Sequence, residues 1–171
     1  MLTRRAPFFA ILLALSAMSP CLRAQDLPAS SAETLEGKKI DFPGALKGSI
    51  AVCVFGFGRE SSDKVTVWLE NLSADGMNAW SVVNIESVKA PARTVVRMTL
   101  KKGIPPALLG RSLVLSKDSK EWLSVLEVKK ETLPTVALFD TEGRLVWKRQ
   151  GTFSGAISDE LKAQIVALAT K

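Results

Sequence analysis

One short segment, Ile50-Ala51-Val52-Cys53-Val54-Phe55, constrains the fold more than any other part of the chain. Successive side chains of a strand point to opposite faces, so six apolar residues in a row are apolar on both faces. A strand of this kind is covered by helices on both sides of its sheet and is typical of parallel α/β structures. The segment therefore predicts the central strand of an α/β domain.

Alternating helices and strands are predicted on both sides of this segment. Residues 35–40 read as a hairpin with its turn at Glu36-Gly37, and Val65, Trp68, Leu69 and Leu72 recur at helical spacing behind a Ser61 or Ser62 cap. Further strands are predicted at 80–85, 112–115, 135–139 and 144–148, and further helices at 92–102, after an Asp118/Glu121 capping box, and after a Ser158 cap. The predicted order is a hairpin followed by β-α-β-α-β-α-β-β-α.

The first 24 residues have the three parts of an export signal. Arg4 and Arg5 form a basic head, residues 6–17 form an apolar run, and Ala24 supplies a small residue at the cleavage point. The apolar run is shorter than the roughly 20 residues that a membrane span needs. We predict a signal peptide at 1–24, a flexible leader at 25–34 and one domain at 35–171, with a periplasmic or secreted location and no membrane span after cleavage. An uncleaved amino-terminal anchor is the alternative.

Charge and composition exclude several function classes. Three of the 23 basic residues leave with the signal and none of the 17 acidic residues do, so the mature net charge is +3. This charge is small and scattered, which argues against nucleic acid; Lys101-Lys102 and Lys129-Lys130 read as pairs at helix ends. The chain has no histidine, which excludes Ser-His-Asp catalysis and histidine-ligated metals. We expect no cofactor and no metal.

Thiol chemistry is restricted to one residue. Cys21 lies in the predicted signal, so Cys53 is the single cysteine of the mature chain, and no Cys-x-x-Cys pair exists. Within an apolar strand a cysteine behaves as a small buried hydrophobe, and burial makes its thiol inert. The sequence thus favours a protein that is not an enzyme. The alternative is a monothiol oxidoreductase that uses Cys53.

Three segments together resemble the thioredoxin-like superfamily, above all its envelope thiol-disulfide oxidoreductases and peroxiredoxin relatives. They are 34–40 with 46–48, the strand 50–55 with its following loop, and 133–145, where the family has a cis-proline before a strand and then an Asp-x-x-Gly hairpin. The resemblance implies a thioredoxin-like three-layer sandwich with a central mixed sheet, an N-terminal hairpin and a helix-strand insertion at 91–116. A weaker likeness, at 104–106, 146–147 and Gly151, is to an ATP synthase assembly factor of the same fold.

The sequence departs from this family at its active site. Where the family places Trp-Cys-x-x-Cys at a helix start, residues 58–63 read Gly-Arg-Glu-Ser-Ser-Asp, and Glu60 and Asp63 stand near the two cysteine positions. Thiol-disulfide exchange requires a thiolate, which a carboxylate cannot replace. The resemblance implies an exported, redox-inactive module that binds a protein or an extended peptide in an assembly or chaperone-like role. The peptide-binding residues it implies are Arg59, Glu60, Ser61, Thr132 and Pro134. A further alternative uses Glu60 and Asp63 for acid-base chemistry or a hard cation.

Overall fold

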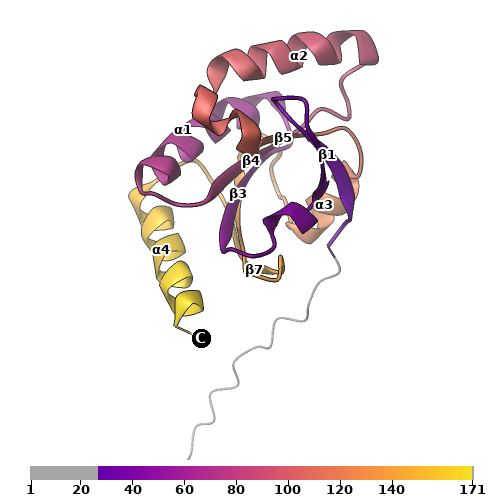
Figure 1. The fold of residues 1–171 in the computed structure, drawn as a ribbon. Helices are drawn as coiled ribbons and strands as arrows, with labels where there is room; N and C mark the ends of the chain where they lie inside the picture. The colour runs from indigo at the N-terminus through magenta and orange to yellow at the C-terminus, as the bar shows by residue number, and fades with distance from the viewer. Residues whose placement is uncertain (1–26, 171) are drawn as a thin grey trace, which may run out of the picture.

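A computed structural model describes residues 27–170 and shows a seven-stranded mixed sheet between helices (Figure 1). The strands are β1 (Ser30–Thr34), β2 (Lys39–Phe42), β3 (Ala51–Gly56), β4 (Ala79–Asn84), β5 (Ser112–Leu115), β6 (Thr135–Phe139) and β7 (Leu145–Gln150). The helices are α1 (Arg59–Ala74), α2 (Ala90–Gly103), α3 (Ser119–Val125) and α4 (Gly155–Ala169), with short 3-10 turns η1 (Gly44–Leu46) and η2 (Pro106–Arg111). This order confirms the predicted α/β class.

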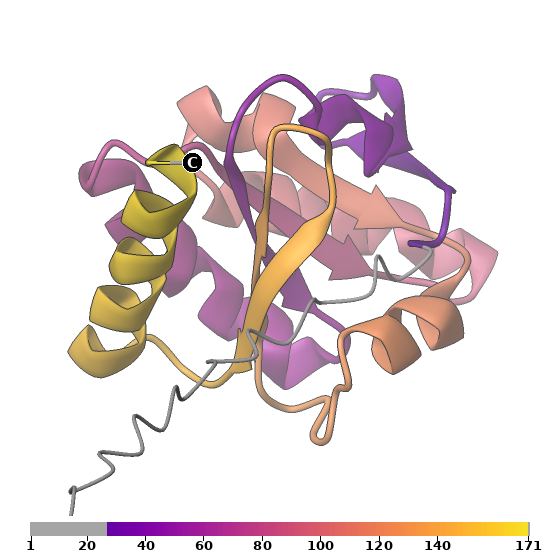
Figure 2. The same cartoon turned by 90° about the horizontal axis from the view of Figure 1, so that it is seen from below.

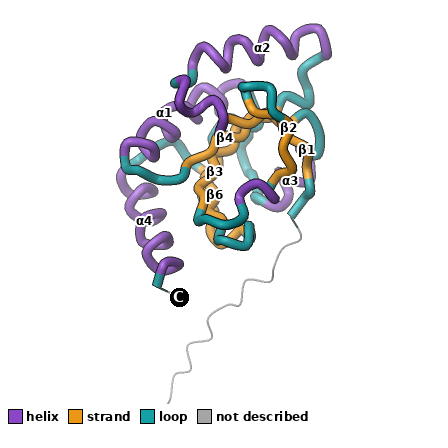
Figure 3. The backbone as a smooth tube through the Cα atoms, in the orientation of Figure 1, coloured by secondary structure: helices purple, strands orange, loops and turns teal. Residues whose placement is uncertain are grey.

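The sheet has the strand order β2-β1-β5-β4-β3-β6-β7. Strands β3, β4 and β5 are parallel, while β6 and β7 close one side and β1 and β2 the other as antiparallel strands. The predicted helix-strand insertion corresponds to α2, η2 and β5, and it places β5 between β4 and β1. The chain therefore forms the mixed sheet that the sequence predicted, with β3 inside it (Figure 3).

The two faces of the sheet carry separate apolar cores. Val52 and Val54 of β3 face one core with α1, α4 and the inner residues of α2, whereas Ala51, Cys53 and Phe55 face the other with α3 and the N-terminal hairpin. Figure 2 shows α1 and α4 on one side of the sheet and α3 on the other. The strand β3 is thus apolar on both faces because each face packs in a core, as expected. Within residues 27–170, no helix is long and apolar enough to cross a membrane.

The N-terminal hairpin begins earlier than the sequence predicted. Ser30–Thr34 was expected in the flexible leader, yet it forms β1, which pairs with β2 and β5. Ser30 is buried, and the Trp122 indole N–H donates to its Oγ at 3.0 Å. The turn at Glu36-Gly37 is confirmed, with Gly37 at φ 94°. The predicted signal peptide lies outside the described residues.

Two predicted helix caps are at the wrong residue, and a third is at the predicted residue, Asp118, but makes no side-chain bond. Helix α1 begins at Arg59 with Gly58 as its N-cap, so Ser61 and Ser62 lie inside the helix. Helix α4 is capped by Ser154, whose Oγ accepts the Ile157 N–H, and Ser158 is buried in its first turns. Asp118 precedes α3 in a left-handed conformation with φ 64° and makes no side-chain cap, so the predicted box with Glu121 does not form.

Candidate functional site

The start of α1 is closed by its own serines. The Gly58 N–H donates to Ser61 Oγ at 2.9 Å, and the Ser61 hydroxyl donates to the Gly58 carbonyl at 2.9 Å. The Ser62 hydroxyl donates to the same carbonyl at 2.8 Å. Ser61 is fully buried, so its hydroxyl is not available to a ligand.

The structure brings the two predicted site segments together. A side-chain carbon at Gly58 would lie 3.1 Å from the Glu131 carbonyl oxygen, which shows how closely the loop before β6 packs on the helix start. The Lys64 ammonium also donates to the Thr132 carbonyl at 3.0 Å. Arg59, Glu60 and Thr132 are exposed on these two adjoining segments, so their side chains face solvent.

Pro134 does not have the conformation that the resemblance implies. Its peptide bond to Leu133 is trans, and among the described residues the cis bond lies before Pro43. Pro134 is buried, and its carbonyl accepts the Gly151 N–H at 2.9 Å. The backbone at Pro134 therefore leads into strand pairing and offers no free acceptor.

The neighbouring backbone is also in use. The Leu133 N–H donates to the Lys130 carbonyl at 3.1 Å, and the Leu133 carbonyl accepts a long bond of 3.5 Å from the Gln150 amide. An extended peptide that docks as a strand needs unpaired main-chain groups. The main chain at 133–134 does not provide them, which leaves the side chains of Arg59, Glu60 and Thr132.

A groove of about 420 Å³ opens on the other side of the α1 start. It lies at the carboxyl ends of β3 and β4, where ligands of open α/β sheets usually bind. Its apolar lining comes from Phe57, Val83, Ile85, Val88, Val95, Val96 and Leu100. Its polar lining includes Arg59, Ser62 and Asp63. One predicted site residue, Arg59, therefore lines a real cavity, whose far wall is α2.

The sequence did not identify the α2 wall, although it contained a signal. Val96 and Leu100 lie four residues apart and pack partly buried against the core. Val95 and Met98 fall outside that inner stripe and are 63% and 57% exposed. Two large apolar side chains on the outer side of an amphipathic helix indicate a binding surface. The helical spacing of the sequence is enough to place them there.

Cys53 lies in the aromatic core under α3. It has no exposed surface, and its neighbours in that core include Phe42, Phe55, Trp122 and Phe139. Burial raises the pKa of the Cys53 thiol well above its ordinary value. A thiolate is therefore disfavoured at this position, which agrees with the predicted structural role.

The carboxylates at the α1 start do not gather further ligands. Glu60 and Asp63 are exposed on the first turns of α1. Among residues 27–170, no group of three or more histidine, cysteine, aspartate or glutamate side chains is arranged to hold a metal ion.

No family model and no curated protein matches the sequence. Solved structures do match. BsSco, a member of the Sco family of cytochrome c oxidase assembly proteins, aligns with a TM-score of 0.58 at 15% identity over 85% of this chain and 94% of its own. A SCO1/SenC family lipoprotein from Bacillus anthracis gives 0.57 at 14% identity over 85% and 96%. The exposed lipoprotein thioredoxin Etrx1 of Streptococcus pneumoniae gives 0.56 at 20% identity over 80% and 99%.

This chain has a thioredoxin-like fold. The observation that decides it is an alignment along nearly the whole of each matched structure, together with the sheet order described above. In this thioredoxin-like fold, α1 follows β3, and residues 58–63, where the resemblance implied a cysteine pair, contain no thiol. The expected fold is confirmed.

Proposed function

We propose that this protein is a redox-inactive, thioredoxin-like binding module that acts outside the cytoplasm and holds an apolar segment of a partner protein. The observation that carries the proposal is the groove between the α1 start and α2. Seven of its fourteen lining residues are apolar, and one of them, Val95, is 63% exposed. Clefts that combine apolar walls with a few polar groups are the usual form of binding sites.

The polar groups at one end of the groove can orient a bound segment. Arg59 and Asp63 lie one helical turn apart at the α1 start, with Ser62 between them. They provide one positive and one negative side chain at the same end of an apolar cleft. A bound segment can therefore place apolar side chains against Val95 and Leu100 and polar main-chain groups toward Arg59 and Asp63.

The absence of thiol chemistry is part of the proposal. Thiol exchange requires an accessible thiolate. In the mature chain Cys53 is the single cysteine, it is buried, and its raised thiol pKa opposes ionisation. The location outside the cytoplasm is supported by the basic, apolar and small-residue order of the first 24 residues. Matched structures described as lipoproteins are consistent with it.

The test measures whether the protein holds unfolded apolar segments. Insulin is reduced with dithiothreitol, and the aggregation of its B chains is followed by light scattering with equimolar protein. We expect the protein to delay aggregation and Val95→Asp to remove most of the delay, because a carboxylate in an apolar contact weakens binding by about tenfold or more. Val166→Asp is the matched control, since Val166 of α4 is also 63% exposed on a helix. An equal loss of the delay in both variants, or no delay by the unmodified protein, would refute the proposal that the groove binds apolar segments.

The alternative of monothiol redox chemistry has its own test. Cys53 is treated with a thiol reagent in native and in denatured protein. Slow native labelling and complete labelling in denaturant are expected for a thiol without exposed surface. Fast native labelling at neutral pH would favour the oxidoreductase, and peroxide turnover lost in Cys53→Ser would establish it.

A further inference from the structure

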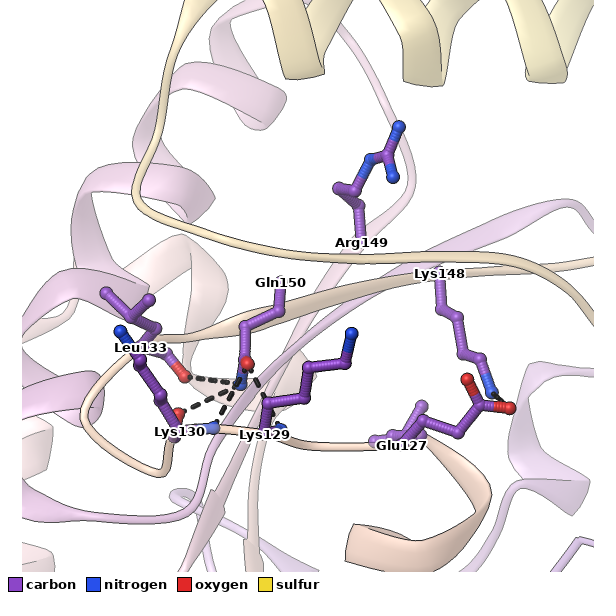
Figure 4. Close-up of a pocket in the computed structure, with 8 residues that line it drawn as sticks. Glu127, Lys129, Lys130, Leu133, Lys148, Arg149 and Gln150 are labelled. Atoms are coloured by element: carbon purple, nitrogen blue, oxygen red, sulfur yellow. Dashed lines mark hydrogen bonds and ion pairs between the residues drawn. The ribbon is translucent and has the colours of Figure 1, made fainter.

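A second hollow, of about 410 Å³, lies on a different part of the molecule (Figure 4). It is formed by the loop between α3 and β6 and by the last residues of β7. Its apolar lining residues are Leu126, which is buried, and Leu133, which is partly exposed. Four basic residues, Lys129, Lys130, Lys148 and Arg149, and one acidic residue, Glu127, also line it. No residue of this hollow lines the α1–α2 groove.

Two of the four cations are neutralised within the protein. The Lys148 ammonium lies 3.0 Å from Glu127 Oε1 and donates to the Val125 carbonyl at 2.7 Å. Arg149 forms a bidentate pair with Glu160 of α4, and Figure 4 shows it pointing away from the other cations. These two side chains therefore hold α3 and α4 to β7.

Lys129 and Lys130 are different. Both are exposed, and neither forms an ion pair with any residue between 27 and 170. They were expected at the end of a helix, where they would complement its dipole. The structure instead ends α3 at Val125 and places both in the following loop. The positive charges of Lys129 and Lys130 are thus not neutralised by the residues between 27 and 170.

The loop that presents these lysines is fixed. The Gln150 side-chain oxygen accepts the backbone N–H groups of Lys129 and Lys130 at 3.2 and 3.1 Å, and the Gln150 amide donates to the Lys130 carbonyl at 2.9 Å. Glu127 turns the chain with φ 51°. Because one side chain of β7 holds three backbone groups, the two ammonium groups start from an ordered backbone, which lowers the entropy lost on binding.

The hollow also lies along an edge strand. β7 is the last strand of the sheet, and Lys148, Arg149 and Gln150 are its final residues. An edge strand has one unpaired row of backbone groups, to which an extended segment can add. A segment that pairs there places its side chains beside Lys129 and Lys130.

We infer that this hollow, formed by Leu126, Lys129, Lys130, Leu133 and the end of β7, binds an acidic, extended segment of a partner protein. Carboxylates pair with Lys129 and Lys130, an apolar side chain covers the partly exposed Leu133, and the segment runs beside β7. The inference does not depend on the α1–α2 groove, since it rests on different residues.

Binding of a defined probe tests this assignment. The probe is a fluorescein-labelled decapeptide of alternating glutamate and valine, and its anisotropy is measured with the purified protein at low and at physiological ionic strength. We expect Lys129→Glu with Lys130→Glu to weaken binding about tenfold or more at low salt, because two attractive contacts become repulsive. We also expect added salt to weaken binding of the unmodified protein.

The matched control is Lys38→Glu with Lys39→Glu. Lys38 and Lys39 are also adjacent and exposed, they lie at β2, the other edge of the same sheet, and their change alters the net charge equally. Less than a twofold change is expected in this variant. An equal loss of binding in both variant pairs would show an effect of net charge alone and would overturn the site. No binding by the unmodified protein would also overturn it, and the lysines would then only protect the edge strand from pairing.

Anionic lipid is the other source of negative charge. Vesicles of phosphatidylglycerol and phosphatidylcholine are therefore tested with the same variants. Binding to vesicles that requires Lys129 and Lys130, without binding to the peptide, would overturn the assignment to a protein segment. Thermal melts of each variant confirm that it is folded. Lys129→Gln with Lys130→Gln removes the two charges without reversing them, and we expect this milder pair to give an intermediate loss of peptide binding.

Discussion

Helices α1 and α2 have the same topological role but are packed in opposite ways. Each connects two neighbouring parallel strands, α1 from β3 to β4 and α2 from β4 to β5. Helix α1 buries Val65, Trp68, Leu69 and Leu72, whereas none of the residues of α2 is fully buried. Figure 1 shows α2 at the top of the molecule, outside the layer that α1 and α4 form. Helix α1 therefore packs into the core against the sheet, whereas α2 lies at the surface of the molecule.

The distribution of apolar residues explains the difference. The four buried residues of α1 form one stripe. In α2 the apolar residues are divided, with Val96 and Leu100 toward the core and Val95 and Met98 toward solvent. Helix α2 is held partly by polar contacts, including an ion pair between Arg97 and Glu33 and hydrogen bonds from Arg93 to the Val88 and Glu86 carbonyls. A helix attached in this way can serve as a wall of a binding groove.

The largest expected effect comes from removing the central residue of α1. Trp68 is fully buried, its indole N–H donates to the Gly151 carbonyl at 3.0 Å, and its ring meets Phe153 edge-to-face at 5.0 Å. Trp68→Ala should lower the free energy of unfolding by about 3–5 kcal/mol. Urea denaturation followed by circular dichroism measures it.

Met98→Ala on α2 is the counterpart of that experiment. Met98 is 57% exposed, so its loss should change the free energy of unfolding by less than about 0.5 kcal/mol. If Trp68→Ala does not fold, Leu72→Ala replaces it with an expected cost of about 2–5 kcal/mol. Similar losses from α1 and α2 variants would mean that the two helices do not differ as described.

Amide hydrogen exchange should separate the two helices in the unmodified protein. Because α2 has little buried surface, we expect its amides to exchange through a local opening that costs at least about 2 kcal/mol less than the opening of α1. Mass spectrometry of peptic peptides from 62–72 and 93–102 gives both values. Equal protection in the two peptides would contradict the comparison.

The smallest expected effect depends on pH. The Ser119 side chain and, after it, the Ser119 N–H, which donates to Glu86 Oε2 at 2.9 Å, lower the pKa of Glu86 below its ordinary value of 4.5. A carboxyl group whose pKa is lowered by folding stabilises the folded state at pH values above its ordinary pKa. This stabilisation is lost as the pH falls through the pKa of the folded state. Acid should therefore loosen the segment before α2 and leave α1 unchanged.

Glu86→Gln isolates this contribution. Glu86 is exposed, so we expect the substitution to cost no more than about 0.5 kcal/mol near neutral pH. The difference from the unmodified protein should vanish once the pH has fallen below the folded pKa of Glu86, where both side chains are neutral. A difference that is the same at neutral pH and in acid would show that the Glu86 charge plays no part.

Much of the fold was predictable because its strongest signals are local. The strands at 51–56 and 135–139 are buried on both faces, and such burial leaves continuous apolar runs in the sequence. Strand β1 was not predictable in this way. Its residues are mostly small and polar, and it is held by pairing with β5 and by the bond from Trp122 to Ser30, both of which join distant parts of the chain.

The site was less predictable than the fold. Arg59 was expected at the site and lines the groove, whereas Ser61 and Pro134 are buried and used internally. The exit of the chain from β3 places the N-cap of α1 at Gly58, three residues before Ser61, which the capping preferences favour. The exposed Val95 and Met98 mark α2 as a surface helix, but its position across the ends of β3 and β4 depends on tertiary packing that no local pattern contains.

The pairing of β1 with β5 also affects the order in which the domain can assemble. Ala32 lies opposite Leu115, so two contacting residues are separated by about 80 positions, and closing such a long loop slows folding. A nascent chain emerges from its amino end. Residues 30–42 therefore wait, without their sheet partner, until the strand at 112–115 has been made. The amino-terminal hairpin is therefore made first but cannot take its place in the sheet before β5 is available.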